Sequence, residues 1–295
     1  MLSKADLTQG SITGTLLRFT LPMIIGSLLQ QCYNIADTLI VGQCIGSGAL
    51  AAVGSAYTLM VFLISILLGL SMGSGTVFSL QYGAGRMKAL RRSIYVSAVL
   101  IGTVTIVLNI AALSFIHPIL KLLQIPDDIY QMMYDYLWII FWGIGFTFIY
   151  NFYAALLRAI GNAVTPLYFL AISVVLNIGL DLFFILLLDW GIKGAAIATI
   201  IAQGVSALGI MGYTYAKCPE LRLHRNDLHF DRHCLKEITS FSTLTCIQQT
   251  VMNLGILMVQ GLVNSFGSMV MAAFLQLVSQ IQRPMVDLSR QIPAA

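Results

Sequence analysis

Two acidic side chains, Asp37 and Asp181, stand in stretches of the sequence that are otherwise almost wholly apolar. If such stretches cross a membrane, a charge held at that depth costs several kcal/mol, and it is tolerated mainly where it faces a cavity. Carboxylates in that setting mark the path of an ion or a proton. We therefore take Asp37 and Asp181 as the first candidates for a binding site.

The neighbours of this pair have the chemistry of cation ligands. Asn177 and Asp181 are four residues apart and share one helix face, and Thr199 falls at a depth comparable with that of both carboxylates. Two carboxylates, an amide oxygen and a hydroxyl suit a hard cation such as Na⁺. The buried pair could instead carry a proton. A purely structural role, as hydrogen-bonding contacts between helices, is the alternative.

The stretch around Asp37 has two further features. Gln30, Tyr33 and Asn34 precede Asp37 at helical spacing and give this stretch a polar stripe. Pro22 stands in its first half and removes a backbone hydrogen bond. We therefore expect a helix with one polar face and a bend near Pro22.

Composition indicates that these elements lie in lipid. Of 295 residues, 58% are hydrophobic and 9% are charged, against roughly 25% charged in soluble domains. Helices are the natural spanning element because they satisfy their backbone groups internally. In the second apolar segment, Gly69, Gly73 and Gly75 predict close helix packing. The sequence thus predicts an all-α polytopic membrane protein with spans near residues 17–41, 56–81, 93–116, 130–153, 165–188, 193–215 and 240–264, and a weaker eighth from about 268.

Positive charge is concentrated in alternate loops. With the N-terminus in the cytoplasm, the outer loops hold only Lys121 and Lys193. The net charge of +4 therefore reflects membrane topology and not nucleic-acid binding. We expect a multi-pass protein of the inner cell membrane with a cytoplasmic N-terminus. Its inner segments hold Lys4, Arg18, Arg86, Lys88, Arg91, Arg92, Arg158, Lys217, Arg222, Arg225, Arg232, Lys236, Arg283 and Arg290.

The longest polar stretch divides the chain unequally. Residues 217–237 predict a cytoplasmic linker between a six-helix lobe at 1–216 and the start of a second lobe at 238–295. The small-residue strings at 45–53 and 266–274 match, as expected of a duplicated membrane protein. From Leu275 onward, polar residues and prolines interrupt the apolar pattern. We expect a second lobe that is incomplete after about two helices, through a fragment or a frameshifted end.

Several motifs together resemble the multidrug and toxic compound extrusion (MATE) transporters. The resemblance implies twelve helices in two lobes, and export of drugs or organic cations in exchange for Na⁺ or H⁺ by a transporter that is monomeric when complete. It also implies a cation site at Asp37, Asn177, Asp181 and Thr199, with the backbone carbonyl of Ala195, and a role for Pro22 in bending the first helix. The motifs are Pro22 with residues 30–37 (QQCYNIAD), residues 81–85 (QYGAG), residues 157–162 (LRAIGN), Asn177 with Asp181, and residues 194–199 (GAAIAT).

Two other functions compete with an antiporter. A flippase for lipid-linked sugars would line its cavity with Arg or Lys, and the basic residues within the seven predicted spans, Arg18 and Lys193, stand only at their ends. An intramembrane aspartyl protease would also use two membrane aspartates, but Leu180 replaces a glycine of its Gly-x-Gly-Asp motif. We therefore expect a transporter and not an enzyme, with no cofactor beyond the coupling ion.

Overall fold

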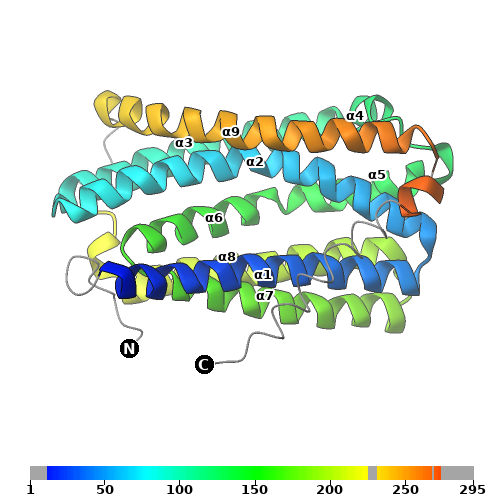
Figure 1. The fold of residues 1–295 in the computed structure, drawn as a ribbon, viewed down its shortest axis with the longest axis horizontal. Helices are drawn as coiled ribbons and strands as arrows, with labels where there is room; N and C mark the ends of the chain where they lie inside the picture. Colours follow the sequence, from blue (N-terminus) through cyan, green and yellow to red (C-terminus); the bar gives the residue numbers. More distant parts are fainter. Residues whose placement is uncertain (1–11, 225–230, 268, 274–295) are drawn as a thin grey trace.

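The computed structural model describes residues 12–224, 231–267 and 269–273, and the regular elements in these residues are all helical. Long helices lie side by side in a bundle whose long axis they follow (Figure 1). Residues 274–295 lie outside the described part, so of the weaker eighth helix only 269–273 are seen, and these are helical. The elements are α1 (Ile12–Cys44), α2 (Ser47–Gly83), α3 (Met87–Ser114), α4 (Ile116–Leu122), α5 (Asp127–Trp142), α6 (Ile144–Ala159), α7 (Val164–Leu182), the π-helix η1 (Phe183–Leu187), α8 (Gly191–Lys217), the 3-10 helix η2 (Pro219–Leu221) and α9 (Arg232–Asn264).

Six of the seven predicted spans correspond to units that are long and apolar enough to cross a membrane, and the first predicted span corresponds to α1. Helices α2, α3, α7 with η1, α8 and α9 are long and apolar enough to cross a membrane, and α5 and α6 together form a bent sixth unit. Helix α1, of 33 residues, is as long, but polar residues at 30–37 interrupt its apolar sequence, and it packs along α7. The chain is therefore an all-α polytopic membrane protein.

The fourth predicted span is broken at Gly143, where α5 and α6 meet at an angle of 47°. A β carbon at residue 143 would stand 3.0 Å from Cγ1 of Ile200 and 3.1 Å from the carbonyl oxygen of Ile140, so any other residue would require its neighbours to shift. Asn109 of α3 donates its side-chain amide to the carbonyl of Phe141 beside the break. The continuous helix expected over 130–153 is thus wrong, because contacts with other helices stabilise the bend.

Helix α9 packs closely along α2 (Figure 1). A β carbon on Gly69 would stand 2.4 Å from the Cα of Cys246, and one on Gly73 would stand 2.3 Å from the Cα of Ser242. Real β carbons essentially never come so close. Glycine at both positions lets the two backbones touch, which is the packing that the sequence predicted for this segment.

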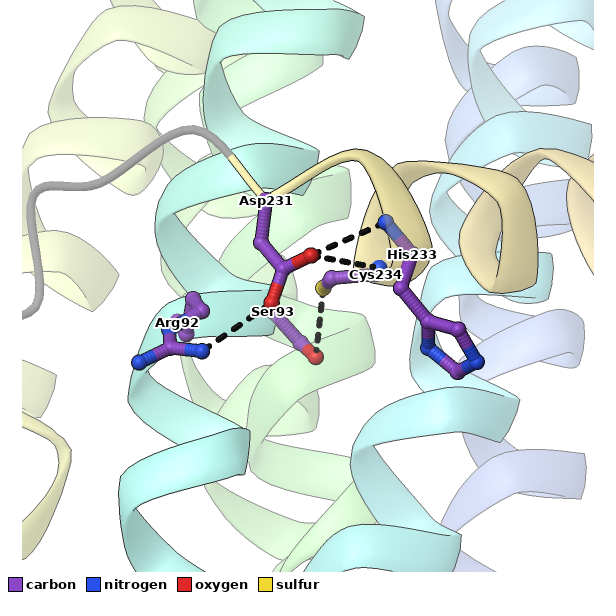
Figure 2. Close-up of polar contacts among 5 residues, drawn as sticks. All are labelled: Arg92, Ser93, Asp231, His233 and Cys234. Carbon is purple, nitrogen blue, oxygen red and sulfur yellow. Dashed lines mark hydrogen bonds and ion pairs between the residues drawn. The ribbon is translucent and has the colours of Figure 1, made fainter.

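Polar contacts fix both ends of α9. At its start, Asp231 accepts hydrogen bonds from the backbone nitrogens of His233 (2.9 Å) and Cys234 (3.5 Å) and forms an ion pair with Arg92 at 3.0 Å (Figure 2). The thiol of Cys234 lies 3.1 Å from the Ser93 hydroxyl. An acidic residue before the first turn is a favourable helix start, so α9 begins inside the stretch expected to be linker.

At the other end of α9, a buried network joins three side chains. Gln260 donates to the Ser55 hydroxyl at 3.0 Å and to Asn264 Oδ1 at 2.9 Å. Asn264 in turn donates to the carbonyl of Leu123 at 2.9 Å. Buried amides that find partners in this way specify one arrangement, so α9 is held against the preceding helices at both ends.

The basic residues are distributed unequally between the two ends of the bundle. The described cations at the α2–α3 junction, after α8 and at the start of α9 lie at one end, whereas Lys121 of α4 and Lys193 at the start of α8 lie at the other. The alternating direction of successive helices produces this separation (Figure 1). The two ends therefore differ in charge as the loop composition predicted.

Candidate cation site

The two membrane carboxylates come from different helices and meet. Asp37 lies in the second half of α1 and Asp181 near the end of α7, and the side chain of each interacts directly with the other. Asp37 is 9% exposed and Asp181 is fully buried. Ionised carboxylates only accept hydrogen bonds, so this contact becomes a hydrogen bond only when one of them carries a proton.

Asn177 and Thr199 complete the predicted set. The buried side-chain amide of Asn177, one turn before Asp181 in α7, donates to the Thr199 hydroxyl of α8 at 3.3 Å. The Tyr33 hydroxyl of α1 lies 3.5 Å from the same Thr199 oxygen. Three helices thus bring together the residues that the sequence placed at one depth.

Four buried oxygens of this cluster accept no hydrogen bond from the described residues: Asp37 Oδ1, both carboxylate oxygens of Asp181, and Asn177 Oδ1. Leaving buried polar atoms without a partner is expensive, and for a charged group the cost is larger still. The oxygen-only donors of the cluster are the kind that hard cations prefer. The arrangement therefore fits either a bound cation or a proton shared between the carboxylates.

Tyr136 is a member of this neighbourhood that the sequence did not reveal. It comes from α5, is buried, and lies close enough to Asp37, Tyr33 and Asp181 to interact electrostatically with them. In the sequence it is one of several aromatic residues in an apolar run, so nothing separates it from a core tyrosine. Only the folded arrangement, in which α5 packs against α8 and α2, brings this side chain near the residues of α1 and α7.

The backbone directly after Asp181 is also unusual. Residues Phe183–Leu187 form a single turn of π-helix, in which the Leu188 nitrogen donates to the carbonyl of Phe183 at 3.2 Å. Such turns are rare and often lie at functional sites. The expected span over 165–188 contains this turn, which its hydropathy could not reveal.

The other predicted residues of α1 lie apart from the cluster or at its edge. Gln30 is exposed, and Asn34 donates its amide to Gln31 (3.2 Å) and to the Tyr57 hydroxyl (2.9 Å). The polar stripe therefore divides, with Tyr33 and Asp37 in the cluster and Asn34 directed to α2. Pro22 lies inside α1, which continues on both sides of it.

Ala195 is buried one turn before Thr199 in α8. Its carbonyl lies inside the regular helix, where the backbone hydrogen-bond ladder uses carbonyls. A direct role for that carbonyl in binding a cation stays a prediction.

Comparison with known sequences gives a consistent result. The family model MatE matches residues 22–183. The chain is 32% identical over 270 residues to the probable multidrug resistance protein YpnP of Bacillus subtilis, covering 91% of this chain and 60% of YpnP. It is 26% identical over 271 residues to the multidrug export protein MepA of Staphylococcus haemolyticus, covering 90% of this chain and 59% of MepA. The chain thus spans about three fifths of the length of these relatives.

Solved structures share the fold. An outward-facing multidrug resistance MATE family transporter of the MOP superfamily aligns with a TM-score of 0.79 at 24% identity, over 87% of this chain and 57% of that one. An inward-facing conformation of such a transporter aligns with a TM-score of 0.77 at 24% identity, over 88% of this chain and 60% of that one. The helix arrangement described above is therefore that of known transporters.

Proposed function

Because this chain belongs to the MATE family of multidrug and toxic compound extrusion transporters, we propose that it serves the export of drugs and organic cations by antiport. The coupling ion, Na⁺ or H⁺, binds at Asp37 and Asp181. The relatives that carry multidrug names support this substrate class. Since the chain spans about three fifths of their length, the activity proposed is that of the whole transporter to which these helices contribute.

The observation that carries the proposal is the set of four buried oxygens without a hydrogen bond from the described residues. A cation among them would compensate the two carboxylates and the free oxygen of Asn177. A proton would achieve part of this by turning the contact between the carboxylates into a hydrogen bond. Both ions use the same atoms, so the site supports either form of coupling.

Coupling follows from where these groups are anchored. Asp37 belongs to α1, whereas Asp181 and Asn177 belong to α7, so an ion that binds all three favours the arrangement in which α1 and α7 are close. Without the ion, the two negative charges repel one another and favour separation. An ion that binds one arrangement more tightly shifts the equilibrium by that difference in affinity, and substrate binding to the other arrangement completes the exchange.

In the proposed orientation, the strongly basic end of the bundle lies on the cytoplasmic side of the inner membrane. Lys121 and Lys193 then face outward. The flippase alternative would need Arg or Lys along the cavity. In the part of the chain that the structure describes, the basic residues of the helices lie within about two turns of helix ends, so this alternative has no support. We propose that the whole transporter acts as a monomer.

Two separate measurements test the proposal. In the first, ²³Na⁺ NMR and proton release on Na⁺ addition are measured on the purified chain, with Asp37→Asn and Asp181→Asn beside the wild type. Saturable Na⁺ binding or proton exchange that both variants lose supports the site, and wild-type behaviour of both variants excludes it.

The second measurement is gradient-driven accumulation of ethidium in everted membrane vesicles that contain the chain. Accumulation that depends on an imposed Na⁺ or proton gradient supports drug antiport, and Asn34→Ala serves as a polar control in α1 outside the cluster. Ion binding without transport would retain the site and reject export by this chain.

A further inference from the structure

A recess of about 570 Å³ lies where α4 meets α5, at the end of the bundle away from the basic loops. This volume is within the range of small-molecule sites. The cation-site residues do not line it. Its lining consists of His117, Lys121, Gln124, Ile125, Asp127 and Tyr130.

The recess contains two opposite charges that do not pair with each other. Within the described residues, Lys121 and Asp127 form no ion pair, whereas Lys193 at the same end of the bundle binds Asp135 at 3.2 Å. The imidazole Nδ1 of His117 lies 2.7 Å from the Tyr130 hydroxyl, so its Nε2 is left for another partner. One wall therefore offers a cation and an imidazole to an anionic group, and Asp127 offers a carboxylate to a cationic one.

Aromatic rings lead from the recess along α5 toward the middle of the bundle. The His117 ring stacks on Tyr134 with centroids 4.8 Å apart, and Tyr134 stacks on Trp138 at 6.5 Å. Trp142 follows one turn later, 6.3 Å from Trp138. The two tryptophans are 42% and 62% exposed. The stripe thus begins at the polar recess and continues about 18 Å along an apolar surface, at 1.5 Å per residue.

We propose that this recess binds the headgroup of a zwitterionic phospholipid with a primary ammonium, phosphatidylethanolamine, with one acyl chain against the Trp138–Trp142 stripe. The phosphate lies against Lys121 and His117, and the ammonium donates hydrogen bonds to Asp127. A purely anionic headgroup would leave Asp127 uncompensated and repelled. A trimethylated ammonium has no hydrogen to donate to that carboxylate, so phosphatidylcholine is the weaker ligand.

The two exposed tryptophans provide a direct measurement. The chain has three tryptophans, so Trp190→Phe leaves fluorescence only from Trp138 and Trp142. This protein is placed in phosphatidylcholine nanodiscs that contain increasing fractions of phosphatidylethanolamine, phosphatidylglycerol or phosphatidylcholine with dibrominated acyl chains, which quench tryptophan on contact. We expect phosphatidylethanolamine to reach half-maximal quenching at a roughly twofold to fivefold lower fraction than the other two, as expected of a partly exposed ion pair.

Variants then separate the two charges. Asp127→Asn should remove the advantage of phosphatidylethanolamine over phosphatidylcholine, and Lys121→Gln should weaken all three lipids, because all carry a phosphate. Lys193→Gln is the matched control and should change none of the curves. Superimposable curves for the three lipids in the parent protein, stronger quenching by phosphatidylglycerol, or an unchanged preference in Asp127→Asn would each overturn the proposal.

Discussion

Asn177 donates its side-chain amide to the hydroxyl of Thr199 over 3.3 Å, and this bond joins α7 to α8 inside the candidate site. With its nitrogen engaged in this way, Asn177 leaves its oxygen Oδ1 without a hydrogen bond from the described residues. The Tyr33 hydroxyl lies 3.5 Å from the same Thr199 oxygen. Thr199 therefore orients groups from two other helices, in addition to any direct contact with an ion.

Thr199→Val should lower both stability and ion affinity. Valine has a similar shape, but it leaves the buried Asn177 amide without its partner, which costs about 1–3 kcal/mol. Thr199→Ser retains the hydroxyl and should remain close to the wild type. Thermal unfolding in detergent with and without Na⁺ measures both effects, and wild-type stability and ion response in Thr199→Val would show that the hydroxyl is not needed.

Ion binding should raise the melting temperature of this chain, because a ligand that binds only the folded state adds about 2.7 kcal/mol at a hundred times its Kd. NaCl is compared with choline chloride at equal ionic strength, and a proton-coupled site would respond to pH instead. Asp181→Asn should remove the response and, in the absence of ion, should unfold at a higher temperature than the wild type, since it removes a buried charge that lacks a partner. A lower ion-free melting temperature would show that another group already compensates Asp181.

Gly73→Ala should separate α9 from α2. Its new β carbon would meet the Cα of Ser242 at 2.3 Å, so one helix backbone must move. Overpacking of this kind costs about 1–3 kcal/mol. Gly255→Ala is the matched control, because it lies in α9 with nothing within 4 Å of the new atom. Hydrogen exchange of α9 amides should increase in the first variant only, and equal exchange in both would contradict the close contact.

Removing the amide of Asn109 should loosen the bend between α5 and α6. Asn109→Leu leaves the Phe141 carbonyl beside the break without that donor, at a cost of about 1–3 kcal/mol if the carbonyl stays dry. Distances between spin labels at the ends of α5 and α6 should broaden or shift. A distribution identical to that of the wild type would show that Gly143 and its neighbours maintain the 47° angle alone.

Acid should release the start of α9. Hydrogen bonds from the backbone nitrogen of His233 and from the Arg92 side chain lower the pKa of Asp231 below its ordinary 3.8. Because the folded pKa is the lower one, the stabilisation is complete above the ordinary value and disappears as pH falls through the folded value. Hydrogen exchange in the first turn of α9 should therefore accelerate, relative to intrinsic rates, only below about pH 4. Asp231→Asn, which still caps a helix, should remove this pH dependence.

The sequence predicted the features that depend on composition and on position along one helix. Span lengths follow from hydropathy, and the meeting of Asp37 with Asp181 was expected from their similar depths in two helices. The bend at Gly143 was missed because a glycine in an apolar run resembles any packing glycine until Ile200 and Asn109 are placed against it.

The start of α9 and the contribution of Tyr136 were missed for a related reason. Asp231 lies in a polar stretch, and its partner Arg92 is 139 residues away in the sequence. Tyr136 becomes part of the site only when α5 packs against α8 and α2 and brings its side chain near Asp37 and Asp181. Both depend on contacts between distant segments, which one sequence read alone does not contain.

The contact between α2 and α9 also has a consequence for biosynthesis. Ser242 donates a hydrogen bond to the carbonyl of Leu70 at 3.2 Å, and these residues are 172 positions apart. At about 5–20 residues per second, a ribosome needs roughly 10–30 s to make that length of chain. The glycine surface of α2 therefore enters the membrane well before its partner exists, and lipid or an insertion factor must cover Gly69 and Gly73 until α9 arrives. The packing of α9 against α2 is thus a late step of assembly, and the rate of translation sets its earliest time.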